Sequence, residues 1–147
     1  TQQWIQHHWR MIVWSLACTE RTFPWQLARK YCNYQNTLDH IKYRYQWELN
    51  DAHSSTLKKI YRGDLSSGCY MVLAVSRIVY ANSKNNSIQR NRLWLTDGWY
   101  EIEAMFADSD IEALVDNGDI KLGDKLKICS ARKEGGACEP LETKAVE

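Results

Sequence analysis

The stretch LWLTDGWYEIEAMF (93–106) decides how the second half of the chain folds. It holds two short apolar-polar runs around Asp97-Gly98, a pair favoured in two-residue turns between antiparallel strands. Beyond that turn, alternation puts four apolar side chains on one face: Tyr100, Ile102, Ala104 and Phe106. We expect this set in the core, which leaves Trp94 and Trp99 pointing away from it. These two tryptophans either pack under neighbouring structure or form a ligand platform.

The residues around this hairpin predict further strands and one helix. A β-branched and aromatic run from Cys69 to Ala81 predicts a strand of about ten residues. Residues 108–118 read as a helix with an acidic first turn and Gly118 just past its end. Residues 121–133 predict another strand after a Gly-Asp turn. The order β–β–β–α–β predicts an OB-fold, a five-stranded Greek-key barrel, over residues 65–147, with the fifth strand apparently missing.

The first part of the chain has a helical period. Residues 4–18 predict a helix with a stripe of Ile5, Trp9, Ile12 and Leu16. Pro24 breaks this helix, and residues 27–32 are expected to form a short helical turn. A long helix is predicted over residues 37–61, with a seam of Leu38, Ile41, Tyr45, Leu49, Ala52, Thr56 and Ile60. Residues 1–64 are therefore expected to be the end of a helical domain, and the fold class is α+β.

Charge is distributed unevenly along a chain whose net charge is only +1. Residues 1–64 carry +4, residues 65–106 carry +1 and residues 107–147 carry −4. A basic front suits an acidic or polyanionic partner, although solvated faces alone produce the same pattern. The chain has seven tryptophans and eight tyrosines, which could be buried in a core or exposed at a recognition surface.

The sequence lacks the motifs that are typical of several function classes. The sequence has no GxSxG, P-loop or HExxH pattern, so we expect no enzyme, no catalytic residue and no cofactor. The five cysteines include no CxxC pair and no zinc spacing, which predicts no metal site and reduced thiols in a cytosolic or nuclear protein. The sequence has no signal peptide and no apolar run of about 18 residues, so we expect no membrane-spanning segment. The chain starts without Met inside an aromatic helix, as an excised fragment would.

Two constellations remain as candidate binding sites. Basic residues predicted to project from the long helix could meet carboxylates or phosphates: Lys42, Arg44, Lys58 and Lys59. Aromatic and basic residues near the hairpin could stack and hold single-stranded DNA, as OB-folds do: Arg77, Arg92, Trp94 and Trp99. Glu101 and Glu103 beside Trp99 repel phosphate, which favours packing over base stacking.

Four motifs, in this order, resemble the DNA-binding region of the breast cancer type 2 susceptibility protein family. They are WIQHHWRMIVWSLA (4–17), KYRY (42–45), LTDGWY (95–100) and ACEPLE (137–142). The resemblance runs through nearly the whole chain, and loop lengths differ around residues 82–91. The chain departs from the family at Met11, usually aromatic, at Ser15, usually basic, and at Trp25 and Trp47, usually polar.

This resemblance implies a fold and a function. Residues 1–64 would be the end of the family's helical domain and residues 65–147 the first of its three OB-folds. The family acts in homologous recombination in the nucleus and loads a RecA-like recombinase on single-stranded DNA. Its helical domain and first OB-fold bind a small acidic partner, the split-hand/split-foot deletion protein. We expect the basic helix residues to steer that partner, with Trp9, Trp14 and Tyr43 receiving its aromatic side chains.

Overall fold

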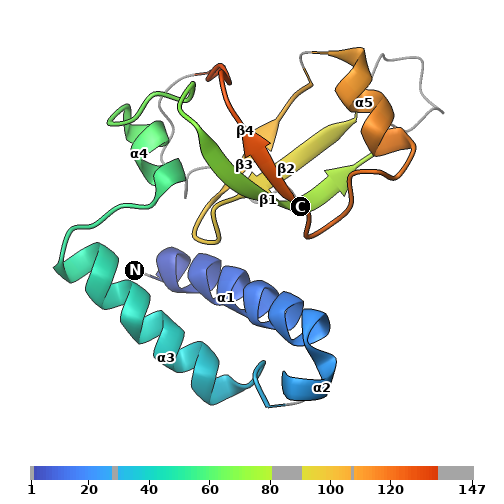
Figure 1. Cartoon of the computed structure of the whole chain (residues 1–147). Coiled ribbons are helices and arrows are strands. Elements are labelled where there is room, and N and C mark those ends of the chain that lie inside the picture. The colour runs from blue at the N-terminus through green and yellow to red at the C-terminus, as the bar shows by residue number, and fades with distance from the viewer. Residues whose placement is uncertain (1, 28–29, 81–90, 107, 136–147) are drawn as a thin grey trace. The chain divides into compact units, whose positions relative to one another are not determined.

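A computed structural model describes residues 2–27, 30–80, 91–106 and 108–135 (Figure 1). The chain forms two compact units. The first, called here the helical unit, contains the described residues up to Leu65, residues 98–100 of the β2–β3 connection, and Gly135. The second, called the sheet unit, contains residues 66–97 and 101–134.

The helical unit begins with a long helix, α1 (Gln2–Thr22), followed by the short α2 (Pro24–Leu27). α1 packs against α3 (Tyr34–Tyr45), and the two run side by side in Figure 1. The predicted first helix is confirmed, but its apolar stripe is only half right. The buried residues are Trp4, His8, Met11, Ile12 and Leu16. Ile5 is 47% exposed, because the buried stripe runs through Trp4 and the polar His8 instead.

The prediction of one continuous helix over residues 37–61 is wrong. α3 passes into a π-helical segment, η1 (Gln46–Asn50), and the chain then leaves the helix before α4 (Thr56–Arg62). Asp and Ser compete with helical hydrogen bonds and favour caps and turns. Ser55 acts in this way, since its side chain accepts a hydrogen bond from the backbone N–H of Lys58 and caps α4.

The break contains a strained residue that can be tested by substitution. Ala52 is exposed and has φ of 56°, in the left-handed region. Glycine removes a Cβ clash of about 1–2 kcal/mol there but adds about 0.4–1 kcal/mol of unfolded-state entropy. We therefore expect Ala52→Gly to raise the free energy of unfolding in urea by roughly 0.5 kcal/mol.

The matched control for this substitution is Ala17→Gly, at an exposed position inside α1. It should lower the free energy of unfolding by about 1 kcal/mol, because glycine in a helix interior only costs entropy. A loss of stability in both variants would contradict the strain at Ala52.

The described residues of the sheet unit form four strands and one helix in the predicted order β–β–β–α–β. They are β1 (Met71–Val79), β2 (Arg92–Thr96), β3 (Glu101–Ala104), α5 (Ser109–Asp116) and β4 (Lys125–Ile128). The strands pair antiparallel in the order β3-β2-β1-β4. The inward side chains Leu73, Val75, Leu93, Leu95 and Val115 are buried and form the core. Asp108 caps α5, and the first turn of this helix is acidic, as predicted.

β4 is shorter than the predicted strand over residues 121–133. Residues 121–124 form a turn in which the N–H of Asp124 donates to the carbonyl of Lys121 and the Asp124 carboxylate accepts from the N–H of Lys121. The predicted fifth strand falls on residues 136–147, which lie outside the described residues.

The β2–β3 connection differs from the predicted two-residue turn. Thr96 pairs with Glu101 and Leu95 with Ile102, so four residues, 97–100, form the connection. Gly98 has φ of 88°, a conformation that suits glycine. Because the register shifts by two residues, the strand faces are kept and Leu95 and Ile102 still share one face. Tyr100 is fully buried, but in the helical unit and not in the core of the sheet.

Candidate protein-docking surface

The four basic residues predicted on one helix divide into an exposed pair and a buried pair. The Lys42 side chain is 66% exposed and pairs loosely with Asp39 one turn away, at 3.6 Å, while Lys59 on α4 is also exposed. Arg44 is only 7% exposed and the Lys58 side chain only 12%. The predicted exposed stripe is therefore wrong at Arg44 and Lys58.

Two hydrogen bonds and a ring contact help to hold Arg44 inside the helical unit. Its guanidinium donates hydrogen bonds to Nδ1 of His8, at 3.0 Å, and to the carbonyl oxygen of Gly98, at 2.8 Å. The same group lies 4.6 Å from the centre of the Trp99 ring, a cation–π geometry. Trp99 also contacts Trp47, with ring centroids 4.6 Å apart. Arg44 thus fastens the β2–β3 connection within this unit.

Glu48 forms the centre of the same buried network. Its Oε1 receives the Lys58 ammonium and the Tyr100 hydroxyl, and its Oε2 lies 3.3 Å from Nε2 of His8. This last approach is not a hydrogen bond, because Oε2 of Glu48 has no hydrogen-bond partner among the described residues. Because the guanidinium of Arg44 can only donate, Nδ1 of His8 carries the lone pair and the ring proton sits on Nε2, which donates to the Tyr100 hydroxyl oxygen at 3.4 Å.

The pKa values in this network favour a neutral His8 and a charged Glu48. Burial lowers the pKa of His8, more strongly than its contact with Glu48 raises it. Burial alone would raise the pKa of Glu48. Its contacts with His8, Lys58 and Tyr100 outweigh burial and lower the pKa to about 2. Neighbouring His7 donates to the carbonyl oxygen of Trp99 at 2.8 Å, and burial lowers its pKa to about 4.

The aromatic residues predicted beside the basic helix differ in exposure. Tyr43 is 60% exposed and follows the exposed Lys42 on α3. Trp9 is half-buried against Tyr34, with ring centroids 5.7 Å apart, and Trp14 is also half-buried. The exposed part of the predicted docking set is therefore Lys42, Tyr43 and Lys59, with Trp9 and Trp14 partly accessible.

Three of the four residues predicted to contact single-stranded DNA share one face of the sheet unit, and the fourth, Trp99, belongs to the helical unit. Arg77 and Trp94 face each other across β1 and β2, and the guanidinium lies 4.2 Å from the ring centre. Arg92 pairs with Glu103 at 3.0 Å, which neutralises its charge. Trp99 belongs to the helical unit, where it packs as the sequence favoured. DNA contact by these residues stays a prediction.

No local pattern in the sequence indicates the network of His8, Glu48 and Tyr100. Arg44 and Glu48 are spaced i, i+4 with opposite charges, which usually marks a solvent-exposed pair. The only available signal was that Thr37, Arg44 and Glu48 recur at helical spacing, and all three are buried. Among the described residues, no group of three or more His, Cys, Asp or Glu could hold a metal ion. None of the described helices has the length and apolar character of a membrane span.

A helical unit followed by an antiparallel four-stranded sheet, among the described residues, defines the class of this chain: a helical domain joined to an OB-type sheet. The family model described as BRCA2, helical, matches residues 1–52. The model described as BRCA2, oligonucleotide/oligosaccharide-binding, domain 1, matches residues 55–146. The chain therefore belongs to the BRCA2 family, and its sheet unit is an OB-fold that follows a helical domain, as predicted.

Two curated relatives from Arabidopsis thaliana agree with this assignment. Protein BREAST CANCER SUSCEPTIBILITY 2 homolog A is 32% identical over 151 residues, and homolog B is 33% identical over 152 residues. Each alignment covers 97% of this chain and 13% of the relative. The chain thus spans about an eighth of the length of these relatives.

Proposed function

We propose that this chain is part of a homologous-recombination mediator that helps to load a RecA-like recombinase on single-stranded DNA in the nucleus. Membership of the BRCA2 family supports a role in DNA repair and recombination. Because the chain spans 13% of its relatives, contact with the recombinase is assigned to other regions of the full-length protein. We propose no catalytic role, since helical and OB domains of this family are non-catalytic in general.

Within that protein, this part would dock the small acidic split-hand/split-foot deletion protein. The observation that carries the proposal is the exposed Lys42, Tyr43 and Lys59 on a helical unit of basic sequence. Exposed cations attract carboxylates and speed encounter, and an exposed tyrosine offers apolar area with a polar tip. Arg44 and Lys58 would support docking only indirectly, because their side chains are held in the buried network of the helical unit.

The test is titration of the acidic partner into the full chain and into Lys42→Glu/Lys59→Glu by calorimetry at two salt concentrations. Each exposed charge contributes about 0.2–1 kcal/mol, so the reversal of two should weaken binding about tenfold at low salt. The affinity of the variant should also depend less on salt. Circular dichroism should show an unchanged helix content, because both side chains are exposed.

The control is Arg21→Glu/Lys30→Glu, which makes the same charge change at exposed residues near the opposite end of α3. It should weaken binding by less than the Lys42 and Lys59 variant. Equal weakening in the two variants would show steering by net charge alone. Unchanged affinity and salt dependence in the first variant would remove Lys42 and Lys59 from the docking site.

Two other interpretations compete with docking. The pairing of Arg77 with Trp94 on an OB-fold sheet favours a single-stranded DNA module. Tight oligo-dT binding at low salt that falls steeply with salt, and is lost in Trp94→Ala, would support that alternative. A chain that binds neither the acidic partner nor oligo-dT would serve as a structural spacer between domains.

A further inference from the structure

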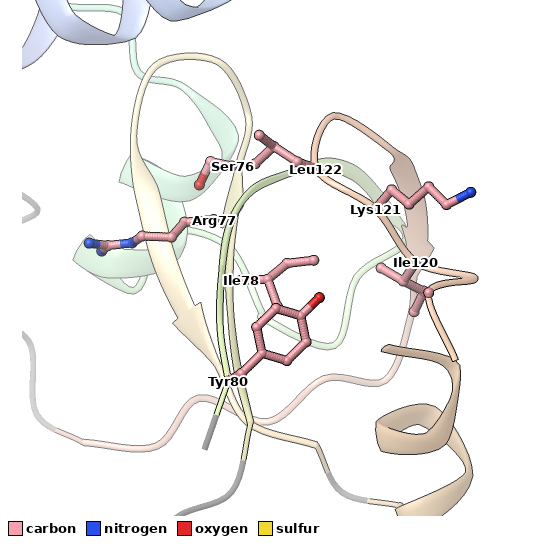
Figure 2. A pocket seen from close by; sticks show the side chains of 8 residues that line it. Ser76, Arg77, Ile78, Tyr80, Ile120, Lys121 and Leu122 are labelled. Atoms are coloured by element: carbon pink, nitrogen blue, oxygen red, sulfur yellow. The ribbon is translucent and has the colours of Figure 1, made fainter. Parts of the chain in front are cut away.

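The turn between α1 and α3, where α2 lies, presents two aromatic side chains to solvent (Figure 1). Trp25 is 98% exposed and Phe23 is 50% exposed, and only Pro24 separates them. By contrast, Tyr80 of the sheet unit is 58% exposed but lies beside Ile78 in an apolar cleft of about 470 Å³ (Figure 2). Trp25 thus packs against almost nothing in its own chain. A large exposed aromatic side chain of this kind is typical of a recognition surface.

The backbone around these two side chains is held in place by hydrogen bonds. The carbonyl oxygen of Phe23 accepts from the N–H groups three and four residues later, at 3.2 and 3.0 Å, and so closes the single turn of α2. Pro24 is the first residue of α2, a position that suits proline. The Glu20 carboxylate on α1 accepts from the N–H of Cys32 at 3.1 Å and ties the chain beyond α2 back to α1. Because the backbone is fixed in this way, less entropy is lost when a ligand orders the surface.

The charges along this turn are positive. Residues 21–38 contain three Lys or Arg and no Asp or Glu. Arg21, in the last turn of α1, and Lys30 are both exposed, and each lies within five residues of Trp25 in the sequence. The carboxylate that precedes this stretch, that of Glu20, is half-buried and already accepts a backbone hydrogen bond. Arg21, Phe23, Trp25 and Lys30, called here the aromatic turn, therefore combine exposed rings with exposed cations.

We propose that the aromatic turn binds a single-stranded nucleic acid, whose bases stack on Trp25 and Phe23 and whose phosphates meet Arg21 and Lys30. Every base has a flat face, so stacking on an exposed ring needs no particular sequence, and cations beside the ring hold the backbone. An acidic peptide fits less well, because it would use the two cations and leave the Trp25 ring in water. The site lies in the helical unit, apart from the sheet, and does not rest on the docking proposed for Lys42 and Lys59.

The probes are a fluorescent thymidine dodecamer and a fluorescent uridine dodecamer, titrated into the full chain and followed by anisotropy at about 50 and about 200 mM salt. Trp25→Ala should weaken the binding of both about five- to hundredfold, the usual effect of removing one stacking ring. Circular dichroism should show an unchanged helix content, because the ring packs against almost nothing. The control is Tyr80→Ala, which removes an exposed ring from a cleft that Arg77 and Lys121 also line. It should leave binding unchanged.

A pair of charge variants separates this site from the docking surface. Arg21→Glu/Lys30→Glu should weaken binding of the dodecamers at low salt, and should reduce the slope of log affinity against log salt by about 1.4 if two phosphate contacts are lost. Lys42→Glu/Lys59→Glu makes the same charge change and should weaken dodecamer binding less. The two variants exchange these roles when the acidic partner is titrated, so a failure of one proposal leaves the other testable. Equal weakening of dodecamer binding in both variants would reduce the site to net charge and overturn it.

An abasic dodecamer with the same phosphates separates stacking from charge. It should bind more weakly than the thymidine dodecamer, and Trp25→Ala should not weaken it further. Equal affinity for the two, no binding of either base-bearing dodecamer at low salt, or unchanged binding in Trp25→Ala would overturn the proposal. Binding lost in Trp94→Ala and kept in Trp25→Ala would move the site to the sheet, and tighter Trp25-dependent binding of oligoglutamate would replace the nucleic acid with an acidic peptide. Where the proposal holds, the tighter of the thymidine and uridine dodecamers identifies DNA or RNA as the ligand.

Discussion

Replacement of Glu48 with glutamine should lower the free energy of unfolding by about 3–5 kcal/mol, the usual cost of breaking a buried ion pair from one side. Glutamine keeps the size of the side chain but removes the charge. The Lys58 ammonium then stays 12% exposed without its counter-charge, and the Tyr100 hydroxyl loses an ionised acceptor. The loss is a large share of the 5–15 kcal/mol typical of a domain. Urea unfolding followed by circular dichroism and tryptophan fluorescence measures it.

Two further variants identify the cause of the Glu48→Gln effect. Asp64→Asn neutralises an exposed carboxylate in the same unit and should change stability by less than about 0.5 kcal/mol. Glu48→Gln/Lys58→Met removes both charges and should recover much of the loss, because no unpaired charge remains buried. A loss below about 1 kcal/mol in Glu48→Gln would show that the network is open to water.

Local patterns predicted the strands and the short helix of the OB-fold well. Periodicity and capping residues indicated β1, β2, β3 and α5. The predicted bounds of these elements lie within a few positions of the observed bounds. The β2–β3 connection was predicted too short by two residues, yet the faces of Leu95 and Ile102 were right because side chains alternate with a period of two. The same prediction misplaced Tyr100, since only tertiary contacts take it out of the strand.

The helical part shows where local reasoning fails. Tyr45 and Leu49, which belong to the predicted apolar seam, are 48% and 44% exposed. Arg44 and Glu48 are buried instead. Apolar periodicity misleads here because each buried charge is compensated by a residue far away in sequence. His8 meets Glu48 across 40 positions, and Glu48 meets Tyr100 across 52. A single sequence carries no signal of such pairs, whereas it did carry the four family motifs.

Arg44 and Lys58 were predicted at the surface but are buried, and this changes which variants can test the docking prediction. Lys58→Glu would place a second carboxylate beside Glu48 and destabilise the fold. Lost partner binding in that variant would report unfolding and not a lost contact. The exposed Lys42 and Lys59 avoid this ambiguity, because neither side chain belongs to the buried network.

The helical unit should also lose stability steadily as the pH falls from about 7 toward 3. The folded-state pKa values of His7 and His8 lie below the usual 6.5, so the unfolded chain binds more protons and acid favours it. For His7 this contribution is complete above pH 6.5 and is lost as the pH falls to about 4, on the order of 3 kcal/mol. The same sign holds for Glu48, whose contribution is complete above 4.5 and is lost as the pH falls toward about 2.

Urea unfolding at a series of pH values between 7 and 4 measures the histidine part of this loss. His7→Gln should flatten the slope between pH 6.5 and 4, because glutamine can still donate toward the Trp99 carbonyl but does not titrate. His40→Gln, at an exposed histidine on α3, should leave the slope unchanged. A chain whose stability stays level or rises on acidification would carry protonated histidines in the folded state. That result would contradict the neutral His8 required by its acceptance of a hydrogen bond from Arg44, and with it the arrangement of charges around Glu48.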